Sequence, residues 1–143
     1  MEEKTRILKK LNNECFGGSE NQLRLLLEHL PDESFKNINL VLNNTDPKLI
    51  ENNKINILWM QHFVNQEEVR NLASKKYIDQ LDFIVFNSHW NFEKFVYQFK
   101  VPENKSLVIR NAVEKISYEE KPKDKINLIY HTTPWRGLAN LIN

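Results

Sequence analysis

Short apolar runs alternate with helical patterns of apolar residues along most of this chain. Four of the runs have the length and the β-branched or aromatic content that strands favour. The run at 81–86 is almost continuously apolar, which is typical of a central parallel strand covered on both faces. The predicted strands are INLVL (38–42), INILWM (55–60), LDFIVF (81–86) and SLVI (106–109).

Amphipathic helices are predicted between these strands. The first is expected to start with Ser19 as its cap, in a capping box with Gln22, and to end before Pro31. A second is expected at 67–76, and Ser88 is expected to cap a third. The apolar positions that repeat at helical spacing are Leu23, Leu26, Leu27 and Leu30, then Val69, Leu72 and Ala73, and then Phe92, Phe95, Val96 and Phe99.

This alternation predicts an α/β fold with a Rossmann-like parallel sheet flanked by helices. In such sheets ligands bind at the carboxyl ends of the strands, so the residues that directly follow a strand are the first candidates for a site.

The pattern breaks at the charge-rich stretch EKISYEEKPKDK, residues 114–125, which we interpret as a linker. It separates a domain at 1–113 from a final segment at 126–143, where a strand pattern, INLIY, precedes a helix pattern. A single β-α unit cannot bury its own apolar faces. We therefore expect 126–143 to be the first β-α unit of an incomplete second domain.

Composition narrows the classes of function. A net charge of +1 and the absence of a nucleic-acid-reading motif argue against binding DNA or RNA through a basic face. Cys15 is the only cysteine, which excludes an internal disulfide framework and a cysteine-rich zinc site, and no two histidines have metal-ligand spacing. We therefore expect no metal.

The sequence also bears on the compartment. The first ten residues lack the apolar core of a secretory signal, and no apolar run is long enough to span a membrane. We expect a cytoplasmic protein, with peripheral association with a membrane left open.

Gly17 and Gly18, two of the three glycines in the chain, stand directly before the first predicted helix. They belong to neither a dinucleotide-binding fingerprint nor a P-loop. Glycines at this position can let backbone N–H groups approach an anion or a sugar, or they can simply form a tight turn. The residues alone leave both interpretations open.

Two further positions carry candidate chemistry. His62 follows the strand INILWM, where it could contact a ligand or pack as an ordinary histidine. Arg136 and Gly137 stand near the start of the last predicted helix, where the guanidinium could hold a diphosphate or lie in solvent.

Four segments, in order, resemble a known family. They are FGGSENQLRLLLEHL, INILWMQHF, DFIVFNSHWNFEKFVYQFKVPENKSLVIRNAV and INLIYHTTPWRGLANLI. Together they resemble the N-terminal half of a GT-B glycosyltransferase of the family 4 kind, followed by the first β-α unit of its C-terminal domain. The third segment is the most specific, because its serine, Trp, Val-Pro, Lys and Asn-x-Val arrive in the family's order.

The resemblance implies roles for the candidate residues. Gly17 and Gly18 would form the loop facing a sugar-nucleotide cleft, with Glu20 beside them at the start of the helix. His62 would be the catalytic residue and would contact the acceptor or the sugar in the cleft. Arg136, next to Gly137, would stabilise the departing nucleotide diphosphate without a metal ion.

This chain departs from the family pattern at several points. Ala112 replaces the glycine of the Asn-Gly-Val turn, and His131-Thr132 stands where many relatives have Gly-Arg. The segment TRILKKLNNE is more polar than the family's first strand should be. The resemblance places the carboxylates of the family's E-x7-E motif in a part that would follow Asn143.

The resemblance implies a truncated or split glycosyltransferase. The parent reaction would transfer a hexose from a nucleotide-sugar donor to a glycan, lipid or other acceptor. We expect the 143-residue chain to be inactive alone and to need a separate C-terminal half or self-association. The alternative is a non-catalytic Rossmann-like module, for binding or interaction, that has lost its donor domain.

Overall fold

The computed structural model of the chain describes residues 2–9, 17–115, 117–118, 120, 123–125 and 139. The chain divides into two compact units, residues 1–112 and 113–143. The sheet and the helices described below belong to the first unit. The β-α unit predicted at 126–143 lies outside the described residues, apart from one position in it.

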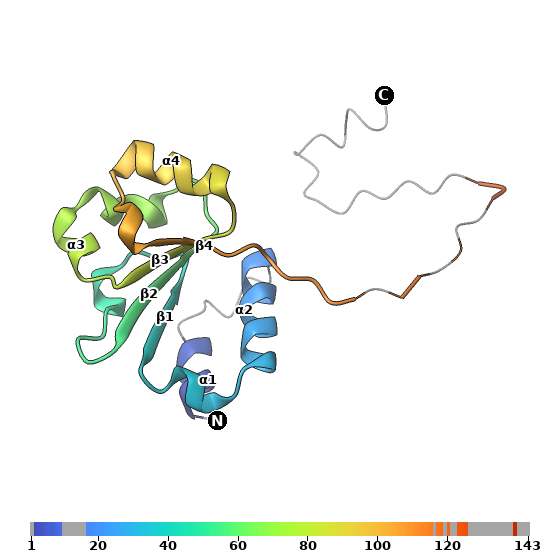
Figure 1. The fold of residues 1–143 in the computed structure, drawn as a ribbon, viewed down its shortest axis with the longest axis horizontal. Helices are drawn as coiled ribbons and strands as arrows, with labels where there is room; N and C mark the ends of the chain where they lie inside the picture. The colour runs from blue at the N-terminus through green and yellow to red at the C-terminus, as the bar shows by residue number, and fades with distance from the viewer. Residues whose placement is uncertain are drawn as a thin grey trace. The chain divides into compact units, whose positions relative to one another are not determined.

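Among the described residues, four parallel strands form the sheet of the first unit, side by side in the order in which they occur in the chain (Figure 1). This confirms the predicted α/β fold with a parallel sheet flanked by helices. The strands are β1 (Ile38–Leu42), β2 (Ile55–Met60), β3 (Phe83–Phe86) and β4 (Ser106–Val108).

Four α-helices and four short 3-10 helices accompany the sheet. The α-helices are α1 (Glu2–Leu8), α2 (Gly18–His29), α3 (Lys75–Asp79) and α4 (His89–Phe99). The 3-10 helices are Asp32–Phe35, Pro47–Leu49, Glu67–Ala73 and Glu103–Lys105.

Helix α4 begins as the sequence predicts. The hydroxyl of Ser88 accepts a hydrogen bond from the backbone N–H of Asn91 at 3.1 Å, which satisfies one of the free donors of the first turn. The helix ends at Phe99, and Lys100 follows in the left-handed region with φ 55°. Phe95 is fully buried, in line with its place on the apolar face.

The capping box predicted for α2 is wrong. The helix is capped by Gly17, whose backbone N–H donates to Oε2 of Glu20 at 2.9 Å. Ser19 therefore lies inside the first turn. Gln22 is not part of the cap, because its side-chain amide bonds the backbone of Ala112 instead.

The helix predicted at 67–76 is also different in the structure. Residues 67–73 form a 3-10 helix, and α3 starts separately at Lys75. Val69 and Leu72 are fully buried, as predicted for the apolar face, but Ala73, predicted on the same face, is exposed.

Residues Glu2–Leu8 form a helix, α1, whereas the family resemblance would place a first strand near this part of the chain. Ile7 is buried against the sheet, and Arg6 fixes α1 to the amino end of β1. The Arg6 guanidinium donates to Glu51 at 2.6 Å and to the carbonyl of Ile38 at 2.7 Å. The polar character of this segment suits a surface helix with one buried position.

The two faces of the sheet carry different sets of helices. On one face, the elements that connect the strands pack over Leu58, Ile84 and Phe86. On the other face, α1 and α2 pack over Leu40 and Val85. Each connection between two strands moves one strand further across the sheet, always toward β4. Right-handed connections that all move this way lie on the same face of the sheet. The second face is thus left to the helices that precede β1.

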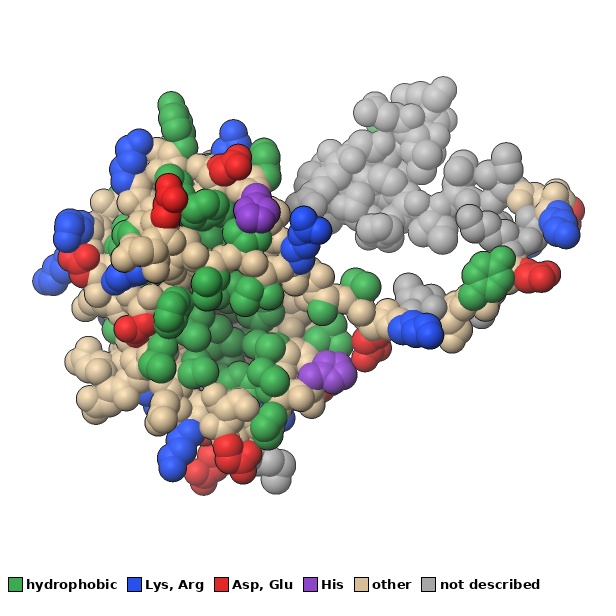
Figure 2. Space-filling view, in the orientation of Figure 1, with side chains coloured by type: hydrophobic (Ala, Val, Ile, Leu, Met, Phe, Trp, Pro, Cys, Tyr) green, Lys and Arg blue, Asp and Glu red, His purple; other side chains and the backbone are tan. Residues whose placement is uncertain are grey.

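These two helices cover the second face only in part. Figure 2 shows hydrophobic side chains gathered between β1 and α2. Four side chains that register with this face stay considerably exposed, namely Ile55 at 44%, Phe83 at 40%, Leu107 at 45% and Ile109 at 55%. The prediction that the strand at 81–86 is covered on both faces is therefore wrong for the beginning of β3.

Tyr77 in α3 has a buried hydroxyl that finds no hydrogen-bond partner among the described residues. Burial, and secondarily the charge of Asp46, raises the pKa of Tyr77 well above its usual value. We expect Tyr77→Phe to keep or raise the free energy of unfolding at neutral pH, by up to about 1 kcal/mol, because it removes an unsatisfied buried group.

The same residue predicts a loss of stability at alkaline pH. The native protein holds the Tyr77 proton, whereas the unfolded chain releases it near the ordinary tyrosine value of about pH 10. The contribution of this retained proton to the free energy of unfolding is complete below that pH, and it is lost as the pH rises toward the raised native pKa. Urea unfolding of the wild type and of Tyr77→Phe, at neutral pH and above about pH 10, measures the alkaline loss of stability that is due to Tyr77. An equal alkaline loss in both proteins would contradict this account.

Candidate pocket at the carboxyl edge of the sheet

Amide side chains follow the strands at the carboxyl edge of the sheet. Asn43, Gln61 and Asn87 are the first residues after β1, β2 and β3, and Asn111 comes shortly after β4. The amide of Asn111 approaches Oε1 of Gln61 at 3.5 Å, at the limit of a hydrogen bond. Side-chain amides, whose C=O accepts and whose NH2 donates hydrogen bonds, thus gather where parallel sheets bind ligands.

Asn43 joins the ends of β1 and β2. Its backbone N–H donates to the carbonyl of Trp59 at 2.9 Å, which extends the ladder between the two strands. Its side-chain Oδ1 accepts the backbone N–H groups of Gln61 at 2.6 Å and of His62 at 3.1 Å. The main chain that carries the candidate residue His62 is therefore fixed from the neighbouring strand.

Asn91 of α4 contacts the same main chain from the other side. It is 4% exposed, and its Nδ2 lies 3.4 Å from the carbonyl of His62 and 3.4 Å from Oδ1 of Asn87. Ser88 places Asn91 here by capping the helix. His62 is thus held at a junction of β1, β2 and α4.

An open pocket of about 230 Å³ lies at this junction. Its floor and walls come from the ends of β2 and β3 and from the first turn of α4. The lining residues are Gln61, His62, Phe63, Asn87, Ser88, Trp90 and Asn91.

The pocket combines an aromatic wall with side-chain amides, a hydroxyl and an imidazole. The rings of Phe63 and Trp90 stack with their centroids 5.4 Å apart and their planes 13° apart, and both side chains are partly exposed to solvent. Lys94 lies with its Nζ 5.6 Å from the centroid of the Trp90 ring. None of the lining residues carries a carboxylate, an amine or a guanidinium. Such a lining suits a neutral ligand that has both hydroxyl groups and apolar C–H surface.

Three nitrogen atoms at this edge are buried without a hydrogen-bond partner among the described residues. They are Nδ2 of Asn43, Nε2 of Gln61 and Nδ1 of His62. Buried polar groups in native proteins are almost always hydrogen-bonded, so their grouping at one edge is unusual. These three atoms show that the described residues leave part of the polar groups at this edge without their usual partners.

The glycine-capped end of α2 reaches the same edge of the sheet. The side chain of Gln22 exchanges two hydrogen bonds, of 2.8 and 2.9 Å, with the backbone of Ala112, next to Asn111. Gly17, Gly18 and Glu20 therefore belong to the same edge as His62, but they do not line its pocket. The N–H of Gly17 already donates a hydrogen bond to the Glu20 carboxylate, so this donor is not available to an external anion.

The remaining candidates lie elsewhere. Arg136 and Gly137 fall outside the described residues. Within the described part of the chain, no group of three or more His, Cys, Asp or Glu side chains is placed to hold a metal ion.

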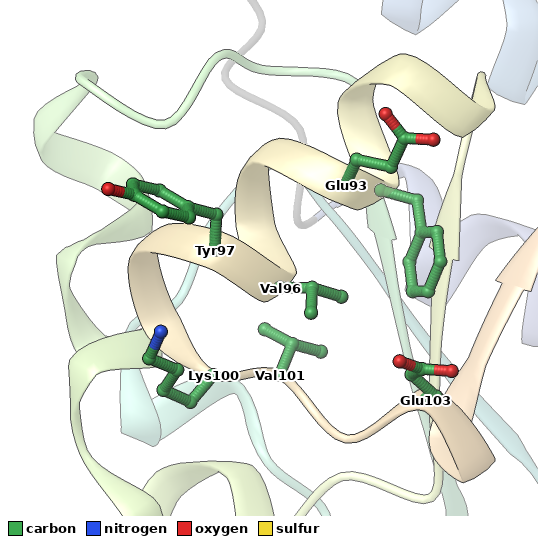
Figure 3. A pocket seen from close by; sticks show the side chains of 7 residues that line it. Glu93, Val96, Tyr97, Lys100, Val101 and Glu103 are labelled. Atoms are coloured by element: carbon green, nitrogen blue, oxygen red, sulfur yellow. The ribbon is translucent and has the colours of Figure 1, made fainter.

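A larger groove of about 490 Å³ lies along α4 (Figure 3). Figure 3 shows two valines at its centre, Val96 from the helix and Val101 from the loop that follows. This loop leads into β4, so the groove runs along α4 toward the amino edge of the sheet, away from the strand ends where ligands of parallel sheets bind. It offers mostly apolar surface and few convergent polar groups, and the smaller pocket is the better candidate site. The groove is lined by Phe92, Glu93, Val96, Tyr97, Lys100, Val101 and Glu103.

Sequence reasoning found His62 but missed the residues around it. A signal was present, because an asparagine or glutamine directly follows each of the runs INLVL, INILWM and LDFIVF. Phe63 and Trp90 could not be paired in advance, since they are 27 positions apart (90 − 63) and meet only through a tertiary contact between the loop after β2 and the first turn of α4.

In the described ranges, no helix is both long enough and apolar enough to cross a lipid bilayer. No family model, curated protein or solved structure matches the chain. The resemblance to GT-B glycosyltransferases therefore stays a prediction from the sequence.

Proposed function

We propose that the first unit binds a sugar at the carboxyl-edge pocket and serves as the acceptor-side domain of a glycosyltransferase of the GT-B kind. The observation that carries this proposal is the lining of the pocket. Amide, hydroxyl and imidazole groups line the pocket together with a stacked aromatic pair, at the carboxyl ends of a parallel sheet.

The chemistry of a sugar matches this lining. Each sugar hydroxyl donates and accepts hydrogen bonds, as do the amides of Gln61, Asn87 and Asn91. The C–H face of a pyranose ring is apolar and packs against aromatic carbon, which Phe63 and Trp90 provide. A lining without a carboxylate, an amine or a guanidinium favours an uncharged sugar over a free phosphate or a cation.

Sugar transfer would be completed by groups outside this unit. In the proposed enzyme, His62 contacts the acceptor or the transferred sugar, and Arg136 with Gly137 holds the diphosphate of the nucleotide-sugar donor. The first unit by itself, which ends before Arg136, is therefore expected to bind simple sugars weakly and nucleotide-sugars no better than the sugars alone.

Replacement of Trp90 tests the aromatic wall. Trp90→Ala removes one ring of the stacked pair, and stacking contacts of this kind contribute about 0.5–1.5 kcal/mol. We expect the dissociation constant for a bound glycoside to rise by about 3- to 10-fold. The probes are the methyl glycosides of glucose, galactose, mannose and N-acetylglucosamine, with binding followed by the backbone amide NMR shifts of Gln61 and His62.

Tyr97→Ala is the matched control. Tyr97 is an aromatic residue on the same helix, 79% exposed, and it does not line the pocket. Its removal should leave glycoside binding unchanged. Equal weakening by both substitutions, or none by Trp90→Ala, would contradict the assignment of the pocket.

Turnover distinguishes a glycosyltransferase from a non-catalytic binding module. The chain would be mixed with a separately expressed C-terminal half of a GT-B enzyme and supplied with UDP- or GDP-sugars and a glycan acceptor. Transfer only in the mixture, abolished by His62→Ala, supports the enzyme. Glycoside binding with no transfer in any mixture supports the binding module.

A further inference from the structure

Asn43 has an unusual backbone conformation for a buried residue. It is 6% exposed, and its φ of 53° lies in the left-handed region that non-glycine residues seldom adopt. Asparagine tolerates this region better than most residues, because its short polar side chain can form local hydrogen bonds. Here the conformation directs the side chain of the first residue after β1 toward the end of β2.

The side chain makes a paired contact with the main chain of the pocket. One oxygen, Oδ1, accepts the N–H groups of two consecutive residues, Gln61 and His62. Together with the contact of Asn91 to the His62 carbonyl, it holds the His62 residue at both its N–H and its C=O. Both asparagines are more than nine-tenths buried, so water competes little for these bonds.

We propose that Asn43 is a positioning residue of the carboxyl-edge pocket, which fixes the Gln61–His62 main chain so that both side chains are presented to a bound sugar. The inference rests on the sugar-binding function proposed above. Asn43 acts through its Oδ1 acceptor and not through contact with the ligand, because it is absent from the lining of the pocket.

This role specifies which substitutions are tolerated. Asn43→Asp keeps an oxygen acceptor for both N–H groups and tolerates the left-handed conformation. Asn43→Gly keeps the conformation without strain but removes the acceptor. The pair therefore separates the hydrogen bonds of the side chain from the shape of the backbone.

The experiment measures amide hydrogen exchange and glycoside affinity in the same variants. In Asn43→Gly, we expect the amides of Gln61 and His62 to exchange about tenfold faster or more, since they lose a buried acceptor. The amide of Leu58 in the middle of β2 should stay protected, which shows that the sheet is intact. Affinity for the methyl glycoside bound by the wild type should fall by about tenfold.

Asn43→Asp should keep both the protection and most of the affinity. The control is Asn44→Gly, a change at the neighbouring exposed asparagine, which should alter neither. Full affinity in Asn43→Gly despite exposed amides would overturn the proposal. So would loss of affinity in Asn43→Asp with protected amides, because the Nδ2 group would then be the one that matters.

Failure of the proposed function gives a different result. If the wild type binds none of the glycosides, the sugar-binding assignment fails for every variant alike. Amide exchange then still decides whether Asn43 fixes the turn: faster exchange in Asn43→Gly supports that part, and unchanged exchange refutes it.

Discussion

Replacement of Phe86 with alanine is expected to lower the free energy of unfolding by about 3–5 kcal/mol. Phe86 is fully buried at the carboxyl end of β3, and its ring centroid lies 5.3 Å from that of Phe95 and 5.7 Å from that of Phe92. The alanine would remove these contacts and leave a cavity between the sheet and α4. Chemical denaturation followed by circular dichroism measures the change.

Phe83→Ala is the matched control within the same strand. Phe83 is 40% exposed and points to the face that α1 and α2 cover only in part. Its removal should lower the free energy of unfolding by no more than about 1 kcal/mol. A loss as large as that of Phe86→Ala would mean that this face is covered in solution.

The second large effect is expected at Asn56, which is 4% exposed. Its Oδ1 accepts from Nδ2 of Asn39 at 2.7 Å and from the N–H of Glu51 at 3.0 Å. Its Nδ2 donates to the carbonyls of Glu51 and Lys54, both at 3.1 Å. Asn56→Ala leaves these groups without their partner at once, and each unsatisfied buried group costs about 1–3 kcal/mol. We expect a total loss of about 2–4 kcal/mol.

The hydrogen bonds of Asn56 also predict that substitutions at Asn39 and Asn56 are strongly coupled in their effects on the free energy of unfolding. The two residues face each other across β1 and β2. Asn39→Ala and Asn56→Ala should together lower the stability by less than the sum of the single changes, because both remove the bond between them. Asn53→Ala, at an exposed position of the same loop, should have little effect. Additive losses at 39 and 56 would contradict the network.

The strands and α4 could be predicted because their signals are local. An apolar run of five or six residues marks β1 or β2, and Ser88 followed by apolar residues at helical spacing marks α4. The arrangement of the strands was not predictable in this way. The order β1-β2-β3-β4 depends on pairing between distant segments, and it decides that one face stays partly open.

Polar residues inside apolar runs were the hardest to interpret. Asn39 and Asn56 each occupy the second position of a predicted strand, where one sequence alone gives no reason to expect full burial. They are buried because the register of β1 and β2 brings them together, and because the loop at 49–54 closes over them. Such a network becomes visible only when the pairing is known.

The candidate site was predicted in part. The rule that ligands bind after the strands of a parallel sheet pointed to His62, which does line a pocket at that edge. The contributions of Asn43 and Trp90 depend on tertiary contacts with β2 and Phe63. Arg136 and Gly137 stay predictions of the sequence, since they lie outside the described residues.

A ¹H–¹⁵N NMR titration of the wild-type chain with the four methyl glycosides tests the central claim most directly. Sugar binding at the carboxyl-edge pocket predicts shifts concentrated at the amides of 61–63 and 87–91 and at the indole N–H of Trp90. The indole of Trp59, which is 8% exposed, serves as an internal reference. Shifts confined to the groove along α4, or no shifts with any of the four glycosides, would contradict the claim.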